Sequence, residues 1–269
     1  MIEESWRSRT AKVEGAPSIS FALLNEHGEL VASRNAERHY YAASTIKLHV
    51  MLAVFARADA GELQLSDPLG ATRSFFGCDG ETFDLTGEHL HPEFPEPGTQ
   101  ISVAEAIHLM ISRSSNEATN MCLALLPDFP SAIGDIARGL GLVGTKVERQ
   151  IGDPAALERG LTNETCALDL AVTMRAIRCG GFLSEEAQHI ALAALRDQQT
   201  PVITHAVSDA VDHGSKSGEI PFIRHDVAFI GDAGIALAVM TSGMGEAEAN
   251  ETIEALATAL LSNHVLTPN

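Results

Sequence analysis

Strand-like segments at the two ends of the chain enclose a long middle whose pattern is helical. Near the start, apolar runs at 19–24 and 30–33 flank the turn sequence Asn25-Glu26-His27-Gly28, which predicts a β-hairpin. Near the end, apolar runs predict strands at 211–216, 227–230 and 235–241 and then a helix over 246–262. Because isolated strands leave backbone groups without partners, we expect both ends to share one antiparallel sheet flanked by terminal helices.

The helical middle begins with a segment that is apolar on nearly all sides. Residues 44–60 are mostly apolar from Ile46 to Phe55, and Gly61 follows where a helix ends, which predicts a buried central helix. Further helical patterns occupy 3–14, 103–112, 116–126, 131–140, 165–178 and 184–198. The fold class expected is α+β, a single domain over 1–269 with an α/β lobe (about 1–43 and 205–269) and an all-α lobe (about 44–204). A site between the two lobes is the natural expectation.

Two segments lack regular periodicity. Residues 66–100 are rich in Gly, Pro, Phe and acidic residues and predict a long loop with one short helix, and 144–163 form a second irregular stretch. Long loops in compact domains are often functional, so we expect the first one to border the site and set its specificity. Its Phe75, Phe76 and Phe83 either contact substrate or, more commonly in such loops, pack beneath the loop itself.

The charge balance excludes some classes of partner. With 18 Lys and Arg against 36 Asp and Glu, the net charge of −18 disfavours nucleic acid and anionic membrane surfaces and leaves a small-molecule substrate as the expected partner. No apolar run is long enough to span a membrane. The first residues lack a basic stretch followed by an apolar one, so as written the chain is expected in the cytoplasm, or outside it if it is a processed form. The oligomeric state stays open.

Cysteine and histidine spacing gives no sign of a metal site. The four cysteines are widely separated and lie among apolar or small residues, which favours buried thiols over disulfides or metal ligands. The eleven histidines show no ligand spacing such as HExxH. We therefore expect no metal and no cofactor.

Ser44 and Lys47 are the first candidate catalytic pair. Their spacing of three residues puts a hydroxyl and an amine on one face of the helix expected over 44–60. A serine hydroxyl becomes a nucleophile when a base takes its proton, and a lysine amine serves as that base when burial lowers its pKa. Taken alone, the pattern fits equally a serine at a helix start with an unrelated lysine.

Two other short motifs have candidate roles. Ser114-Ser115-Asn116 lies between two helical patterns, where a serine can relay a proton and an asparagine can orient an amide; its alternative is a capped interhelical turn. Lys216-Ser217-Gly218 ends a strand-like run, where a cation and a hydroxyl can bind a carboxylate; its alternative is a strand end with a tight turn.

Together and in this order, the three motifs resemble the class A β-lactamase and penicillin-binding serine hydrolase superfamily. The resemblance extends over nearly the whole chain, and residues 224–227 look like the strand that follows the third motif in class A-like hydrolases. It implies a β-lactamase/transpeptidase-like fold and the following roles: Ser44 as nucleophile, Lys47 as base, Ser114 as proton relay, Asn116 orienting lysine and substrate, Lys216, Ser217 and Arg224 binding a carboxylate, Gly218 admitting substrate, and the N–H groups of Ser44 and Glu219 forming an oxyanion hole. Arg224 has an alternative role as the ion-pair partner of Asp226 or of a surface acid.

The chain departs from this family where a deacylating glutamate is expected. In the segment 149–155, aligned on Arg149, the glutamate position is Ile151 and a later asparagine position is Ala155. Asp153 and Glu158 are nearby acids that either replace the glutamate or, as the commoner case, face solvent. The implied activity is β-lactam amide hydrolysis. The alternatives are a DD-peptidase or esterase on the same fold, a sensor that is acylated without turnover, and a non-catalytic helical interaction protein.

Overall fold

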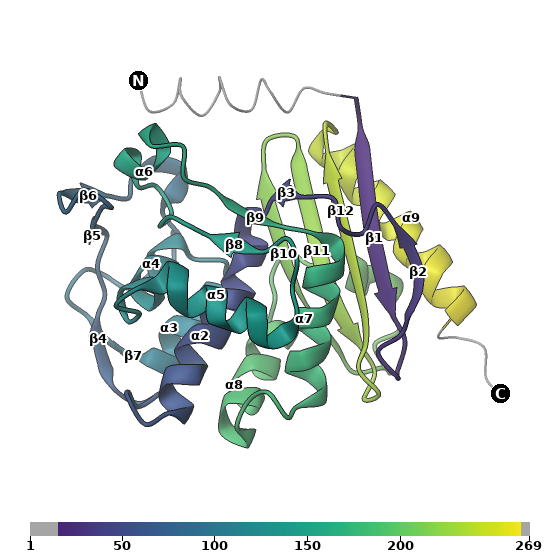
Figure 1. Ribbon diagram of the computed structural model, residues 1–269, viewed down its shortest axis with the longest axis horizontal. Coiled ribbons are helices and arrows are strands. Elements are labelled where there is room, and N and C mark those ends of the chain that lie inside the picture. Colours follow the sequence, from purple (N-terminus) through teal and green to yellow (C-terminus); the bar gives the residue numbers. More distant parts are fainter. Residues whose placement is uncertain (1–15, 265–269) are drawn as a thin grey trace.

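The sheet contains strands from both ends of the chain, as predicted. The computed structural model describes residues 16–264, so the helix expected over 3–14 lies outside the described residues. Five antiparallel strands run in the order β10-β11-β12-β1-β2, and β1 pairs with β12 from Ser18↔Ser242 to Leu24↔Ala236 (Figure 1). The strands are β1 (Ser18–Leu24), β2 (Leu30–Arg34), β10 (His213–Ile220), β11 (Ile223–Ile230) and β12 (Ile235–Ser242). The expected α+β fold class is therefore confirmed.

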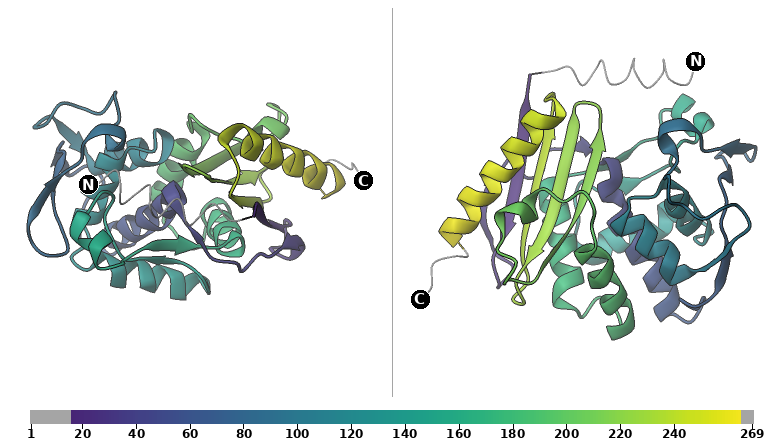
Figure 2. Two further views of the ribbon diagram at one scale, coloured as in Figure 1. Left: turned by 90° about the horizontal axis from the view of Figure 1, so that it is seen from above. Right: turned by 180° about the vertical axis from the view of Figure 1, so that it is seen from behind.

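Helices cover both faces of this sheet. The last helix, α9 (Glu246–His264), packs on β11 and β12 from one side, and α7 (Ala167–Cys179) packs on β1, β11 and β12 from the other (Figure 2). All eight residues of β11 are buried, which is what a strand covered on both faces requires. β10, at one edge of the sheet, faces the helical part of the molecule.

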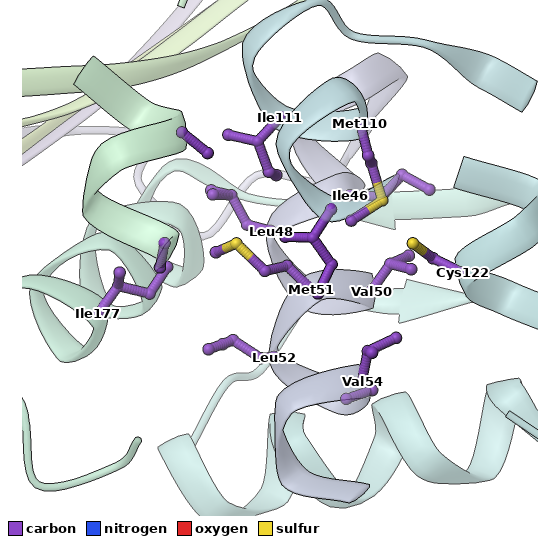
Figure 3. Packing of buried hydrophobic residues seen from close by; sticks show 14 of the residues in the cluster. Ile46, Leu48, Val50, Met51, Leu52, Val54, Met110, Ile111, Cys122 and Ile177 are labelled. Carbon is purple, nitrogen blue, oxygen red and sulfur yellow. The ribbon is translucent and has the colours of Figure 1, made fainter. Parts of the chain in front are cut away.

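The central helix predicted over 44–60 is present and buried. It starts as the 3₁₀ turn η1 (Ala43–Ile46) and continues as α2 (Lys47–Asp59), of which every residue from Lys47 to Phe55 is buried. Figure 3 shows its apolar side chains among Met110 of α3 (Val103–Ser112), Cys122 of α4 (Asn116–Ala124) and Ile177 of α7. Burial of each such side chain contributes about 1.5–3 kcal/mol, so this helix is fixed rigidly in place.

The helices expected over 103–112, 116–126, 131–140, 165–178, 184–198 and 246–262 are present with small shifts at their ends, whereas a short helix at 154–158 and a 3₁₀ turn at 203–206 were not expected. Ser115 caps α4 by accepting a hydrogen bond from the N–H of Ala118 at 3.1 Å, and this fixes the start of the helix that carries Asn116. The other helices are α5 (Phe129–Leu140), α6 (Pro154–Glu158), α8 (Glu185–Arg196) and the 3₁₀ turn η3 (Ile203–Ala206). Within residues 16–264, no helix is long and apolar enough to cross a membrane.

The two segments predicted to be irregular contain short strands. Residues 66–100 contain the expected short helix, η2 (Gly87–His89), and also strands of two small antiparallel ladders, one of which is completed by residues 100–102. The additional strands are β4 (Pro68–Gly70) with β7 (Gln100–Ser102), β5 (Ser74–Phe76) with β6 (Thr82–Asp84), and β8 (Lys146–Val147) with β9 (Asn163–Thr165) and β3 (Tyr40–Tyr41). Strands of two or three residues are too short to show a period of two, so sequence periodicity missed them.

Two other expectations were wrong in detail. β10 continues to Ile220 rather than ending near Lys216, because an edge strand tolerates the polar residues Ser217 and Glu219 that ended the apolar run. Burial was expected for all four cysteines; Cys122 and Cys166 are buried, but Cys78 and Cys179 are exposed, since each lies in or beside a turn at the surface. Neither difference alters the layers of the fold.

Candidate active site

The start of the central helix holds Ser44 and Lys47 at the junction of the sheet and the helices. Ser44 lies in η1 and is half-buried, whereas Lys47, the first residue of α2, is fully buried. The residue before the serine, Ala43, has a positive φ of 47°. For a residue other than glycine this conformation costs about 1–3 kcal/mol, and such strain is concentrated at functional sites.

The Lys47 amine joins the first motif to the second. Its Nζ donates hydrogen bonds to the Ser114 carbonyl oxygen at 2.6 Å, to Ser114 Oγ at 3.2 Å and to Asn116 Oδ1 at 3.0 Å. Ser114 itself has a positive φ of 55°, a strained conformation that turns the chain between α3 and α4. Ser114 and Asn116, which follow Lys47 by 67 and 69 positions in the sequence, therefore both bind its buried amine nitrogen.

The third motif reaches the same serine from the sheet. Lys216 Nζ donates to Ser114 Oγ at 3.2 Å and to the Ser217 carbonyl oxygen at 2.8 Å. Ser114 Oγ thus lies between two buried lysines, one on α2 and one on β10. The structure brings together Lys47, Ser114, Asn116 and Lys216, which the sequence analysis singled out separately.

Burial changes the protonation of both lysines. Burial, reinforced by the charge of Lys216 and opposed by Glu117, lowers the pKa of Lys47 well below 10.5. Burial, reinforced by Arg224 and opposed by Asp226, lowers the pKa of Lys216 to about 7. Near neutral pH the pair can therefore hold an amine that accepts a proton, which is what activation of a serine hydroxyl requires.

Gly218 lets β10 approach the serine closely. A Cβ on Gly218 would lie 3.0 Å from the backbone nitrogens of Ser44 and Thr45 and 3.1 Å from the Ala42 carbonyl oxygen. These are backbone atoms, so they cannot move aside as a flexible side chain would. The glycine is therefore needed for the contact between the sheet edge and η1.

Replacing Gly218 with alanine should separate β10 from η1. We expect the melting temperature to fall, since overpacking of this kind costs about 1–3 kcal/mol. The control is Gly245→Ala, because a Cβ on Gly245 meets no atom of the described residues within 4 Å. Equal melting temperatures for G218A and the unmodified protein would contradict this role.

A family assignment follows from sequence comparison. The model of the β-lactamase enzyme family matches residues 2–264. The chain belongs to this family. No curated protein sequence matches it.

Solved structures of two β-lactamases and of PBP-A share the fold over nearly the whole chain. A β-lactamase from Sphaerobacter thermophilus is 26% identical with a TM-score of 0.79, and the match covers 99% of each chain. A class A β-lactamase from Mycobacterium abscessus is 19% identical with a TM-score of 0.75, covering 95% of this chain and 98% of the other. A variant of PBP-A, in an acyl-enzyme complex with penicillin G, is 22% identical with a TM-score of 0.74, covering 97% and 96%.

In this β-lactamase-family site, Arg224 of β11 forms an ion pair with Glu219 of the neighbouring strand β10. Its guanidinium donates to the Glu219 carboxylate, which lies directly across from it in the β10–β11 register. It also donates to the Thr200 carbonyl oxygen at 3.4 Å, while Thr200 Oγ1 lies 2.8 Å from Ser217 Oγ. Asp226, the other partner considered, accepts instead from the N–H groups of Val202 and Ile203 at 2.8 Å each.

The loop that departs from the family pattern is held against α4. Asn120 accepts from the Ile151 N–H and donates to the Ile151 carbonyl oxygen, both at 2.9 Å. Asn116 and Asn120 are four residues apart and share one face of α4, so this clamp keeps residue 151 beside the helix face that contacts Lys47. The Ile151 side chain is half-buried and packs against the main core.

The two acids considered as replacements for a glutamate have other positions. Asp153 is buried and caps α6 by accepting from the Ala156 N–H at 3.0 Å, and it also accepts from the Cys78 N–H at 2.9 Å. A carboxylate held by two backbone donors is committed to structure. Glu158 is exposed at the end of α6.

The other aromatic, metal and polar candidates are placed as follows. Phe75 is buried against Phe83, with ring centroids 6.1 Å apart, so both pack beneath their loop, whereas Phe76 is 70% exposed. In the described part of the chain, no group of three or more His, Cys, Asp or Glu residues could hold a metal ion.

The sequence analysis did not identify the contacts made by Thr200 and Asn120. Only Asn120 had a sequence signal, which is its position four residues after Asn116 on the same helix.

Proposed function

We propose that the chain is a serine hydrolase that works through an acyl-enzyme on Ser44, with the β-lactam amide as its reference substrate. The observation that carries this proposal is the buried Lys47 amine, with its lowered pKa, bound to both Ser114 and Asn116. In its neutral form the amine has two N–H groups and so keeps two of its hydrogen bonds, and its lone pair takes the proton of Ser44 Oγ as the oxygen attacks the substrate carbonyl carbon. The similarity to the Sphaerobacter thermophilus β-lactamase supports the same reading.

The other residues of the site supply the remaining steps of acylation. The N–H groups of Ser44 and Glu219 stabilise the oxyanion. Gly218 allows β10, which carries Glu219, to lie close to the backbone of Ser44. Ser114 Oγ, between the two lysines, passes a proton to the leaving nitrogen as the carbon–nitrogen bond breaks. Asn116 holds Lys47 and orients the substrate amide.

Deacylation is the weak step of this scheme. Hydrolysis of the ester needs a base that positions water, and residue 151 supplies an alkyl side chain instead. Asp153 is engaged as a helix cap. A β-lactam, whose leaving group stays tethered, would then remain as a long-lived ester. This favours, as a second candidate, a penicillin-binding protein or esterase on the same fold.

Labelling with a fluorescent penicillin followed by peptide mapping tests the proposal. We expect one labelled peptide, containing Ser44, in the unmodified protein. Label on another residue, or the absence of label at penicillin concentrations in the millimolar range, would overturn the proposal.

The pH dependence of acylation should report the base. The neutral fraction of Lys47 grows as pH rises through its pKa, and burial has lowered that pKa, so the rate should rise with pH and level off well below pH 10.5. The measurement is the single-turnover labelling rate with an uncharged β-lactam, which keeps the substrate charge constant. A rate that keeps rising up to about pH 10.5 would mean that an ordinary exposed lysine is titrating.

Replacing Ile151 with glutamate should create turnover. The Asn120 clamp acts on the backbone of residue 151 and is kept, so residue 151 stays beside the helix face that contacts Lys47. We expect the acyl-enzyme to hydrolyse about a hundredfold faster, within the usual range for a general base. The control is Ile151→Gln, because glutamine has the shape of glutamate but no carboxylate that could act as a base. Equal lifetimes for the two variants would contradict this placement.

A further inference from the structure

The subsite at the end of the β10–β11 hairpin already contains a carboxylate of this chain. Ser217 and Glu219 lie two residues apart on β10 and so share a face of the sheet, and Arg224 lies opposite Glu219 on β11. The Glu219 carboxylate accepts from the Arg224 guanidinium, whose side chain is only 7% exposed. The pairing follows from the strand register, because directly opposed residues face each other.

The remaining donors of this subsite are also engaged. Ser217 Oγ and Thr200 Oγ1 share a hydrogen bond of 2.8 Å, and Arg224 reaches the Thr200 carbonyl oxygen. Burial lowers the pKa of Lys216, beside Ser217, to about 7, so its positive charge is disfavoured compared with that of an exposed lysine. A substrate carboxylate placed here would meet an arginine that is already paired, a lysine whose charged form is disfavoured by burial, and the Glu219 carboxylate.

The field of the whole molecule acts in the same direction. With a net charge of −18, the chain repels anions as they approach. An anionic substrate must therefore overcome both the overall field and a local carboxylate within the subsite itself.

We propose that the acyl donor of this site is uncharged where it meets Ser217, Glu219 and Arg224: an ester or lactam without a carboxylate at that end. This inference rests on the proposed acylation of Ser44. The like charge of Glu219 would raise the free energy of an anionic donor, while a neutral donor keeps the Glu219–Arg224 pair intact and still reaches Ser44 beside Gly218.

Penicillin G and its methyl ester form a matched pair of probes that differ only in this carboxylate. The measurement is the second-order rate constant for adduct formation on Ser44, by intact-protein mass spectrometry, divided by the rate of alkaline hydrolysis of each compound. After that correction, we expect the unmodified protein to react about tenfold faster with the ester. Faster reaction with the acid would overturn the inference.

Glu219→Gln removes the negative charge and keeps the backbone N–H of residue 219. The corrected preference for the ester should fall by about tenfold, through faster reaction with the acid. The control is Glu62→Gln, which removes the same charge from a Glu–Arg pair; its partner Arg57 lies ten residues, roughly 15 Å, along α2 from Lys47. E62Q should leave the preference unchanged within about twofold.

The possible outcomes separate the two proposals. An E219Q protein with the preference of the unmodified protein would overturn the inference while leaving Ser44 acylation intact. If neither compound forms an adduct, the proposed function fails, and the inference fails with it. If E219Q melts at a much lower temperature than E62Q, the variant is set aside. The ratio of the corrected rates for the ester and the acid in the unmodified protein then tests the inference.

Discussion

Replacing Ser44 with alanine is expected to abolish covalent labelling by β-lactams while leaving the fold unchanged. Ser44 is half-buried in η1, and its neighbours Ala43 and Thr45 are set by the contacts of η1 with β10. Loss of the hydroxyl removes the atom that forms the ester, so the labelling rate should fall by at least about 10⁴-fold. The measurement is single-turnover labelling with a fluorescent penicillin.

Two controls make this result specific. Ser33→Ala changes an exposed serine on β2, at the opposite edge of the sheet from β10, and should label normally. Calorimetry with an uncharged β-lactam should still detect non-covalent binding to S44A, because the groups around the serine remain. A variant that labels at more than about a hundredth of the normal rate would show that another residue is the nucleophile.

Replacing Lys47 with methionine is expected to slow acylation by about a thousandfold. Methionine fills the volume of the lysine stem but cannot take the proton of Ser44 Oγ, and general-base catalysis contributes about 10²–10⁴-fold. The variant also leaves Ser114 and Asn116 without the donor that now holds them. Single-turnover labelling measures the loss, and the rate should no longer show the pH dependence of the unmodified protein.

Stability distinguishes a catalytic from a structural effect of this change. Removing the fully buried amine removes a group that is costly to desolvate, but it also leaves the Ser114 and Asn116 oxygens without that donor, at about 1–3 kcal/mol for each buried acceptor. The two effects oppose each other, so we expect a moderate drop in melting temperature and a protein that still folds. Lys146→Met, at a half-exposed lysine on β8, is the control and should label normally. K47M labelling within about tenfold of normal would contradict the assignment of the base.

The sequence was informative where chemistry depends on local spacing. Ser44 and Lys47 lie within one turn of a helix, so their common face follows from helix geometry alone. The apolar run from Ile46 to Phe55 predicted a buried helix, and burial is what changes the lysine pKa. The order of the three motifs led to the correct fold, since both ends of the chain do meet in one sheet.

The contacts that tune the site could not be predicted, because they depend on tertiary register. β10 was expected to end near Lys216, so nothing placed Glu219 opposite Arg224 on a neighbouring strand. Thr200 meets Ser217 from 17 residues away, and Asn120 holds Ile151 from 31 residues away. Such pairs are defined by the packed fold, which periodicity and local motifs do not describe.

The most direct test of the account is a time course of intact-protein mass after mixing with a penicillin or a cephalosporin. Opening a penicillin ring expels no atom, so acylation of Ser44 should add the full mass of the compound, and the adduct should persist because residue 151 supplies no base. A stable adduct that is absent in S44A is the predicted result. Failure of every β-lactam, charged or neutral, to add its mass to the protein would contradict the account.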